Sequence, residues 1–167
     1  MNSLGDRFWD IIDATVSPDY DAQLESLGTA LSKLSGDELI AFEADFRRAS
    51  LGAYRWDLWG AAYVINGGCS DDGFIDFRSW LIAQGKDVYD RALSDPESLA
   101  DHIVEAFAEF EEFAYVPIEV FETTQDADWP SPSTAFPSEP EGKRWEENDL
   151  DRLFPRLTAK VAELEED

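Results

Sequence analysis

Two mostly apolar segments, residues 57–65 and 71–84, lie close together in the chain and limit its possible folds most strongly. The first, DLWGAAYVI, is apolar on every side after its first residue, which is typical of a helix surrounded by protein. A buried strand is the alternative for so short an apolar run. The Ala-Ala pair and the Asn66-Gly67 stop favour the helix, because asparagine and glycine tolerate the left-handed turn that ends one.

The stretch between the two segments, residues 66–70, predicts a tight turn followed by a second helix. Ser70 is placed to cap that helix, and Asp71 and Asp72 lie in its first turn, where the helix dipole favours negative charge. At 100° per residue, the apolar side chains of the second helix cover an arc of roughly 220°, so we expect most of it to be buried. These side chains are Phe74, Ile75, Phe77, Trp80, Leu81 and Ile82.

Arg78 falls inside this apolar arc, which is an unusual place for a guanidinium group. An unpaired buried charge is very costly, so we expect a carboxylate partner from another part of the chain, with Asp57 and Asp72 as candidates. A structural ion pair is one interpretation of Arg78. An arginine that lines a pocket for an anionic ligand is the other.

The remaining apolar residues also recur with helical spacing, which predicts an all-α fold. We expect a single helical domain over residues 1–167, a compact helical bundle of about seven helices. Ser17-Pro18 predicts one helix start, and Ser35 with Glu38 matches a capping box at another. The stripe that follows the first of these signals is Tyr20, Leu24, Leu27, Leu31 and Leu34.

Prolines indicate where regular structure is interrupted. Pro117 should kink or break the chain, and Pro155 should bend the last helix or mark its restart. Residues 124–143 are rich in proline and serine, which predicts a long irregular loop, too short to separate two domains.

The charge is strongly negative and unevenly distributed. Thirteen basic against 37 acidic residues give a net charge of −24, which argues against direct nucleic-acid binding and against docking to a membrane surface. Residues 93–128 contain eleven acidic residues and no Lys or Arg. Their spacing predicts an acidic helix over residues 97–112 with an inward apolar stripe. That stripe is Leu99, Ile103, Phe107, Phe110 and Phe113.

The carboxylates of this predicted helix recur at i+4 or i+3 and form a candidate partner face. They are Glu97, Asp101, Glu105, Glu109 and Glu112. Three uses remain open: keeping the protein soluble, docking a basic partner protein, and imitating nucleic acid. The imitation would be coarse, because carboxylates at i+4 repeat about every 6 Å and phosphates of one DNA strand about every 3.4 Å.

Catalytic and metal chemistry has few candidates. Cys69 and His102 are the single cysteine and histidine, so an internal disulfide and a structural zinc site of the Cys/His kind are excluded. A helix start after Cys69 would lower the thiol pKa, and His102 is the one imidazole that could act as its base. Neighbouring acids would hold His102 protonated, however, so a small, partly buried cysteine in a tight turn is favoured over a Cys69–His102 pair. Asp71, Asp72 and Asp76 carry oxygen ligands but lack the spacing of a calcium loop. We expect no metal and no cofactor.

The location expected for such a chain is the cytoplasm. One cysteine is typical of a reducing compartment, and the N-terminus, MNSLGDRFWD, lacks the basic stretch and apolar core of a signal peptide.

The run DLWGAAYVINGGCSDDGFIDFRSWLIAQGKDVYDRAL resembles the signature of an uncharacterised bacterial family catalogued as domain of unknown function 4240. The resemblance extends to RFWDIID, EFEEFAYVPIEVFE and NDLDRLFPRLTAK, and so covers nearly the whole chain. It implies no activity, substrate or cofactor. A signature that includes polar residues such as Asn66, Asp76 and Arg78 exceeds what a core requires, which favours a functional site there.

Two functions stay open. The first is a cytoplasmic interaction or regulatory module that engages a partner through this motif and the acidic face. The second is a small enzyme or ligand-binding protein whose site is the motif. The candidate site residues are Asn66, Cys69, Ser70, Asp71, Asp72, Asp76 and Arg78. A concave pocket at the motif would favour the second function, and an apolar surface rimmed by acids would favour the first. No oligomeric state follows from the sequence.

Overall fold

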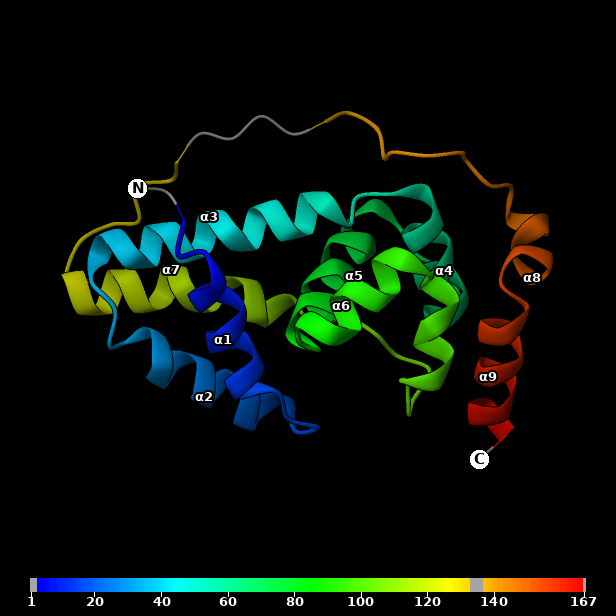
Figure 1. Ribbon diagram of the computed structural model, residues 1–167, viewed down its shortest axis with the longest axis horizontal. Helices are drawn as coiled ribbons and strands as arrows, with labels where there is room; N and C mark the ends of the chain where they lie inside the picture. Colours follow the sequence, from blue (N-terminus) through cyan, green and yellow to red (C-terminus); the bar gives the residue numbers. More distant parts are fainter. Residues whose placement is uncertain (1–2, 133–136, 167) are drawn as a thin grey trace.

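The computed structural model describes residues 3–132 and 137–166, and in these ranges the protein is built from helices (Figure 1). The α-helices are α1 (Asp6–Thr15), α2 (Tyr20–Leu31), α3 (Gly36–Gly52), α4 (Trp56–Asn66), α5 (Asp71–Ala83), α6 (Lys86–Ser94), α7 (Glu111–Gln125), α8 (Leu150–Leu153) and α9 (Pro155–Glu166). The 3₁₀ helices are η1 (Pro96–Asp101) and η2 (Glu147–Asp149). The all-α prediction is confirmed, with more and shorter helices than the about seven expected. None of the helices in the described ranges is long and apolar enough to cross a membrane.

Side-chain caps mark where α2 and α3 begin. The predicted capping box opens α3: Ser35 Oγ accepts the Glu38 N–H at 3.2 Å, and Glu38 Oε1 accepts the Ser35 N–H at 3.0 Å. The predicted start of α2 at Ser17-Pro18 is early by two residues. Asp19 is the cap instead, and its carboxylate accepts two N–H groups of the first turn, which a serine further upstream cannot reach.

The central pair of helices, α4 and α5, forms as predicted, and the strand alternative is excluded. Helix α4 ends where Gly67 adopts a left-handed conformation at φ 68°, and Ser70 Oγ accepts the Gly73 N–H at 3.1 Å to begin α5. Fully buried side chains from the pair include Leu58, Ile65, Phe74, Phe77 and Leu81. The prediction is wrong for Ile75, which lies at the edge of the expected arc and is 49% exposed.

The acidic helix expected over residues 97–112 does not form as one element. Helix η1 ends at Asp101, residues 102–110 are irregular, and α7 begins at Glu111. Phe107, assigned to the inward stripe, is 48% exposed. The physical reason is that like charges at i+4 disfavour a continuous helix, whereas the irregular backbone finds partners elsewhere. The Phe110 N–H, for example, donates to a carbonyl of α5 at 3.1 Å.

Helix α7 runs through Pro117 without the interruption that was expected. Proline removes one helical hydrogen bond, but this stretch of α7 is held by its packing against α2, α3 and α5. Phe113, Val116 and Phe121 are buried on the same helix. Tertiary packing therefore outweighs the local preference of proline to end a helix.

The predicted irregular loop is confirmed from residue 126, since α7 itself extends to Gln125. Its residues 133–136 lie outside the described ranges. Helix α7 ends at the left of Figure 1 and α8 lies at the right, so the connection spans the length of the molecule. Pro155 marks the restart of the last helix, as predicted, and α9 packs against α4 and η1.

Candidate functional site

The corner motif, residues 66–78, uses its polar groups to join the elements around it. The Asn66 amide holds the backbone of Ala108 with two hydrogen bonds: Nδ2 donates to the carbonyl at 3.3 Å, and Oδ1 accepts the N–H at 2.7 Å. The Cys69 carbonyl accepts a hydrogen bond from Trp59 Nε1 at 2.9 Å. These contacts shape the turn and attach the irregular segment 102–110 to it, and they use both polar atoms of the Asn66 amide.

Arg78 is buried as predicted, at 7% exposure, but the expected carboxylate partner is absent. No carboxylate of the described residues lies within 4 Å of its guanidinium group. Instead Nη1 donates to the Ser50 carbonyl at 3.2 Å and Nε donates to the Phe74 carbonyl at 3.3 Å. The guanidinium carbon lies 4.7 Å from the ring centroid of Tyr54 and 4.8 Å from that of Phe74.

Neither of the two expected carboxylate partners, Asp57 and Asp72, pairs with Arg78. Asp57 pairs with Arg55 through hydrogen bonds of 3.0 and 2.6 Å, and Asp72 is exposed in the first turn of α5. Burial lowers the pKa of Arg78, and the nearby Tyr54 acts in the opposite direction. Carbonyl oxygens and aromatic faces therefore accommodate this charge in place of an ion pair.

Cys69 and His102 do not form a nucleophile–base pair. Burial, with the charges of Glu109 and Asp76, raises the pKa of the Cys69 thiol to about 12, contrary to the lowering expected from a helix start. His102 Nε2 shares a hydrogen bond with Gln84 Oε1 at 2.8 Å. Burial lowers the pKa of His102, so the prediction that neighbouring acids keep it protonated is wrong.

The predicted acidic partner face is divided among separate elements. Both oxygens of Glu97 accept N–H groups at the start of α9, from Arg156 at 3.0 Å and Leu157 at 2.7 Å. Asp101 pairs with the Arg156 guanidinium at 2.7 Å. Two of the five acids thus hold the C-terminal helix, and Glu105 lies exposed in the irregular segment.

Other acids gather where α5, the irregular segment and the start of α7 meet. We call this the acidic surface; it consists of Asp72, Ile75, Asp76, Glu109, Glu111, Glu112 and Tyr115. Ile75 and Tyr115 are nearly half exposed, at 49% and 47%. In the described part of the chain, none of these five carboxylates has a basic side chain within 4 Å. Glu111 was missed from the sequence, although two glutamates opening a helix next to buried phenylalanines were the available signal.

The pKa of Asp76 reflects the close spacing of carboxylates on the acidic surface. Its half-buried carboxyl has a pKa raised to about 6, first by burial and then by Glu111, Glu109, Asp72 and Glu112. At pH 7 the fold therefore keeps several like charges close together without compensation, which is unfavourable for stability.

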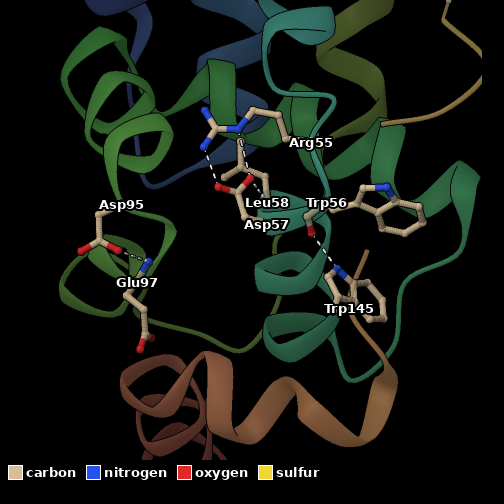
Figure 2. A network of polar contacts seen from close by, with 7 residues as sticks. All are labelled: Arg55, Trp56, Asp57, Leu58, Asp95, Glu97 and Trp145. Carbon is tan, nitrogen blue, oxygen red and sulfur yellow. Dashed lines mark hydrogen bonds and ion pairs between the residues drawn. The ribbon is translucent and has the colours of Figure 1, made fainter. Parts of the chain in front are cut away.

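A cavity of about 720 Å³ lies away from the corner motif. We call it the C-terminal cavity. Its walls are the start of α4 (Arg55 and Asp57), the turn into η1 (residues 95–97), the returning segment 141–145, and residues 149–154. Figure 2 shows the Arg55–Asp57 pair on one side and Trp145 donating to the Trp56 carbonyl on the other. Sequence analysis missed this cavity because its walls are far apart in the chain.

The fold and charge define an acidic, all-α protein with two distinct surface features, an acidic surface and a cavity. The chain belongs to the family described as "Protein of unknown function (DUF4240)", whose model matches residues 4–123. This confirms the resemblance of the corner motif and places the C-terminal wall of the cavity outside the matched region. No curated protein and no solved structure matches the chain.

Proposed function

We propose that the protein is an interaction module, with a regulatory role, that docks a basic segment of a partner protein on the acidic surface. The observation that supports this most is the gathering of five carboxylates from two separate stretches of the chain, residues 72–76 and 109–112, with no basic side chain within 4 Å among the described residues. Folding brings them together against their repulsion, and a cationic partner would relieve that repulsion.

Two exposed apolar side chains add to the acids. Ile75 is next to Asp76 on α5 and one turn from Asp72, and Tyr115 donates a hydrogen bond to Glu111 at 3.0 Å. Apolar and aromatic side chains with a charged rim are typical of protein interfaces. The partner is proposed to be a protein, because a net charge of −24 opposes binding to nucleic acid and to anionic membranes.

The alternative function, a ligand site or enzyme at the corner motif, is less well supported. Asn66, Ser70 and Arg78 bond to backbone groups, and burial raises the pKa of the Cys69 thiol, which disfavours the thiolate that a nucleophile needs. The proposed place of action is the cytoplasm, where a reduced single cysteine is ordinary.

A labelled peptide with lysine and leucine on one helical face would test the proposal by fluorescence anisotropy. The variant Asp76→Asn/Glu109→Gln/Glu112→Gln removes three charges from the acidic surface. We expect its affinity to fall about tenfold, the effect of three charge contacts of about 0.5 kcal/mol each.

The matched control removes three exposed acids elsewhere, in the variant Asp10→Asn/Glu25→Gln/Glu163→Gln. Its affinity should stay near that of the unmodified protein. An equal loss in both variants would mean that the acids act only as a general field, and the proposal would fail. Pull-down from a bacterial lysate at low and high salt, with both variants in parallel, would then identify the natural partner.

A further inference from the structure

The C-terminal cavity, which the proposed function does not use, has the size and lining of a ligand site. Its volume of about 720 Å³ lies within the roughly 300–1,000 Å³ of small-molecule pockets. Trp145, Leu153 and Phe154 form an apolar part of the wall, and Leu153 is 43% exposed. An apolar wall of this kind gives a ligand body something to pack against.

Most acidic side chains of the lining are already held inside the protein. Asp57 makes a two-pronged pair with Arg55. Asp95 accepts the Glu97 N–H at 3.1 Å, and both carboxylate oxygens of Glu97 accept backbone N–H groups of α9. These hydrogen bonds occupy the carboxylate oxygens, so fewer of them are free to bind a cation in the cavity, and the charge of Asp57 is compensated by Arg55.

Two of the four basic side chains of the lining, Lys143 and Arg144, are less occupied than the other two. Asp149 and Arg152 form a loose pair at 3.4 Å, and Glu141 is the remaining acid of the wall. Lys143 and Arg144 have no carboxylate within 4 Å among residues 3–132 and 137–166. The Arg144 guanidinium carbon instead lies 5.3 Å from the ring centroid of Trp56, which orients it without neutralising its charge.

The backbone on each side of these two basic residues is anchored to the start of α4. The Glu141 N–H donates to the Tyr54 carbonyl at 3.0 Å, and the Trp56 N–H donates to the Glu141 carbonyl at 2.9 Å. Four residues further on, Trp145 Nε1 donates to the Trp56 carbonyl at 2.6 Å. The basic pair thus lies on a short segment fixed at both ends, which lowers the entropic cost of binding.

We infer that the C-terminal cavity binds a small organic anion. The phosphate, sulfonate or carboxylate group of this ligand contacts Lys143 and Arg144, and the apolar body of the ligand lies against Trp145 and Leu153. A chain of net charge −24 repels anions as a whole, so binding one needs a local gathering of bases. Four basic and five acidic residues line this cavity, and Arg55 and Arg152 are paired with two of the acids, so Lys143 and Arg144 are the bases whose charge is left for an anion in the described chain.

Phenyl phosphate is the probe for this site, and its binding is measured by titration calorimetry. ¹H–¹⁵N spectra follow the signal of the Trp145 indole N–H during the same titration. The variant Trp145→Phe assigns that signal. We expect saturable binding at one site. Affinity should fall about tenfold or more in Lys143→Gln/Arg144→Gln, because two charge-assisted contacts are removed. Lys143→Gln alone keeps the Arg144–Trp56 contact and should show a smaller loss with unchanged thermal stability.

Matched controls separate the site from general charge effects. Lys33→Gln/Lys160→Gln removes two bases outside the cavity and should leave the affinity unchanged. Inorganic phosphate should bind more weakly than phenyl phosphate, and phenethylammonium should not compete. The inference is overturned if phenyl phosphate shows no saturable binding, if the cavity variant binds as well as the control, or if the aromatic cation binds equally well.

Discussion

The corner motif and the C-terminal cavity contain similar side chains but use them in opposite ways. At the corner, Asn66 and Arg78 bond to backbone carbonyls and an N–H group, and Arg78 also lies against aromatic rings. At the cavity, Lys143 and Arg144 have no carboxylate partner in the described chain. A cluster of polar residue types in sequence therefore does not indicate free binding groups; the hydrogen-bond partners decide.

The largest expected effect tests the structural role of the corner. Arg78→Ala should lower the free energy of unfolding by about 3 kcal/mol, because it empties the space between Tyr54 and Phe74 and removes the hydrogen bond to the Ser50 carbonyl. Arg78→Lys should lose less, since it keeps a donor but not the stacked planar group. Denaturant unfolding measures both. Unchanged stability in Arg78→Ala would contradict the conclusion that the polar side chains of the corner motif hold the fold together.

A smaller effect is expected where the C-terminal segment packs on α4. A Cβ atom at Gly60 would lie 2.6 Å from Phe154 Cε2 and 3.0 Å from Trp145 Nε1. Gly60→Ala should therefore destabilise the protein by about 1–2 kcal/mol and loosen the cavity wall. Limited proteolysis should then cleave faster between residues 126 and 146. Thr29→Ala is the control, because Thr29 is exposed on α2. Equal cleavage rates in Gly60→Ala and Thr29→Ala would show that the cavity wall does not depend on the close packing at Gly60.

The smallest expected effect is on the pH dependence of stability, which Asp76 on the acidic surface should alter. The folded pKa of Asp76, about 6, is above the ordinary 3.8, so the folded state binds the proton more tightly than the unfolded state. Stability should fall as pH rises from about 4 to about 6 and stay lower at pH 7. Asp76→Asn should remove that part of the pH dependence and stabilise the protein at pH 7 by about 1 kcal/mol, a value reduced for solvent screening.

Thermal unfolding between pH 4 and pH 7 measures this difference, with Asp10→Asn as the control because Asp10 is exposed on α1. A pH profile of Asp76→Asn that follows the unmodified protein would show that charge crowding at the acidic surface has no energetic consequence.

Local features of the sequence were sufficient for much of the fold. The apolar segments 57–65 and 71–84, the capping box at Ser35 and the stop at Gly67 all act through neighbours within a few residues, and each appears as expected. Local rules failed where distant packing competed with them, as at Pro117 inside α7.

The candidate site could be predicted only in part, for the same reason. Sequence identified Asp72 and Asp76 and the unusual burial of Arg78, but neither the acids that surround Asp76 nor the partners of Arg78. Apart from Asp72 and Phe74 on α5 itself, those neighbours come from residues 109–112 and from residues 50–54, and no spacing rule relates these stretches to α5.

The sequence by itself determined the helical class, the buried central pair and the strongly acidic character, because periodicity, caps and net charge are properties of consecutive residues. Only the tertiary structure decided which charges are satisfied. It brings Glu97 to the start of α9, places the backbone of Ser50 beside Arg78, and leaves Lys143 and Arg144 at a cavity with no carboxylate within 4 Å in the described part of the chain. Hydrogen bonds and ion pairs act over a few ångströms, so they depend on which distant segments the fold makes neighbours.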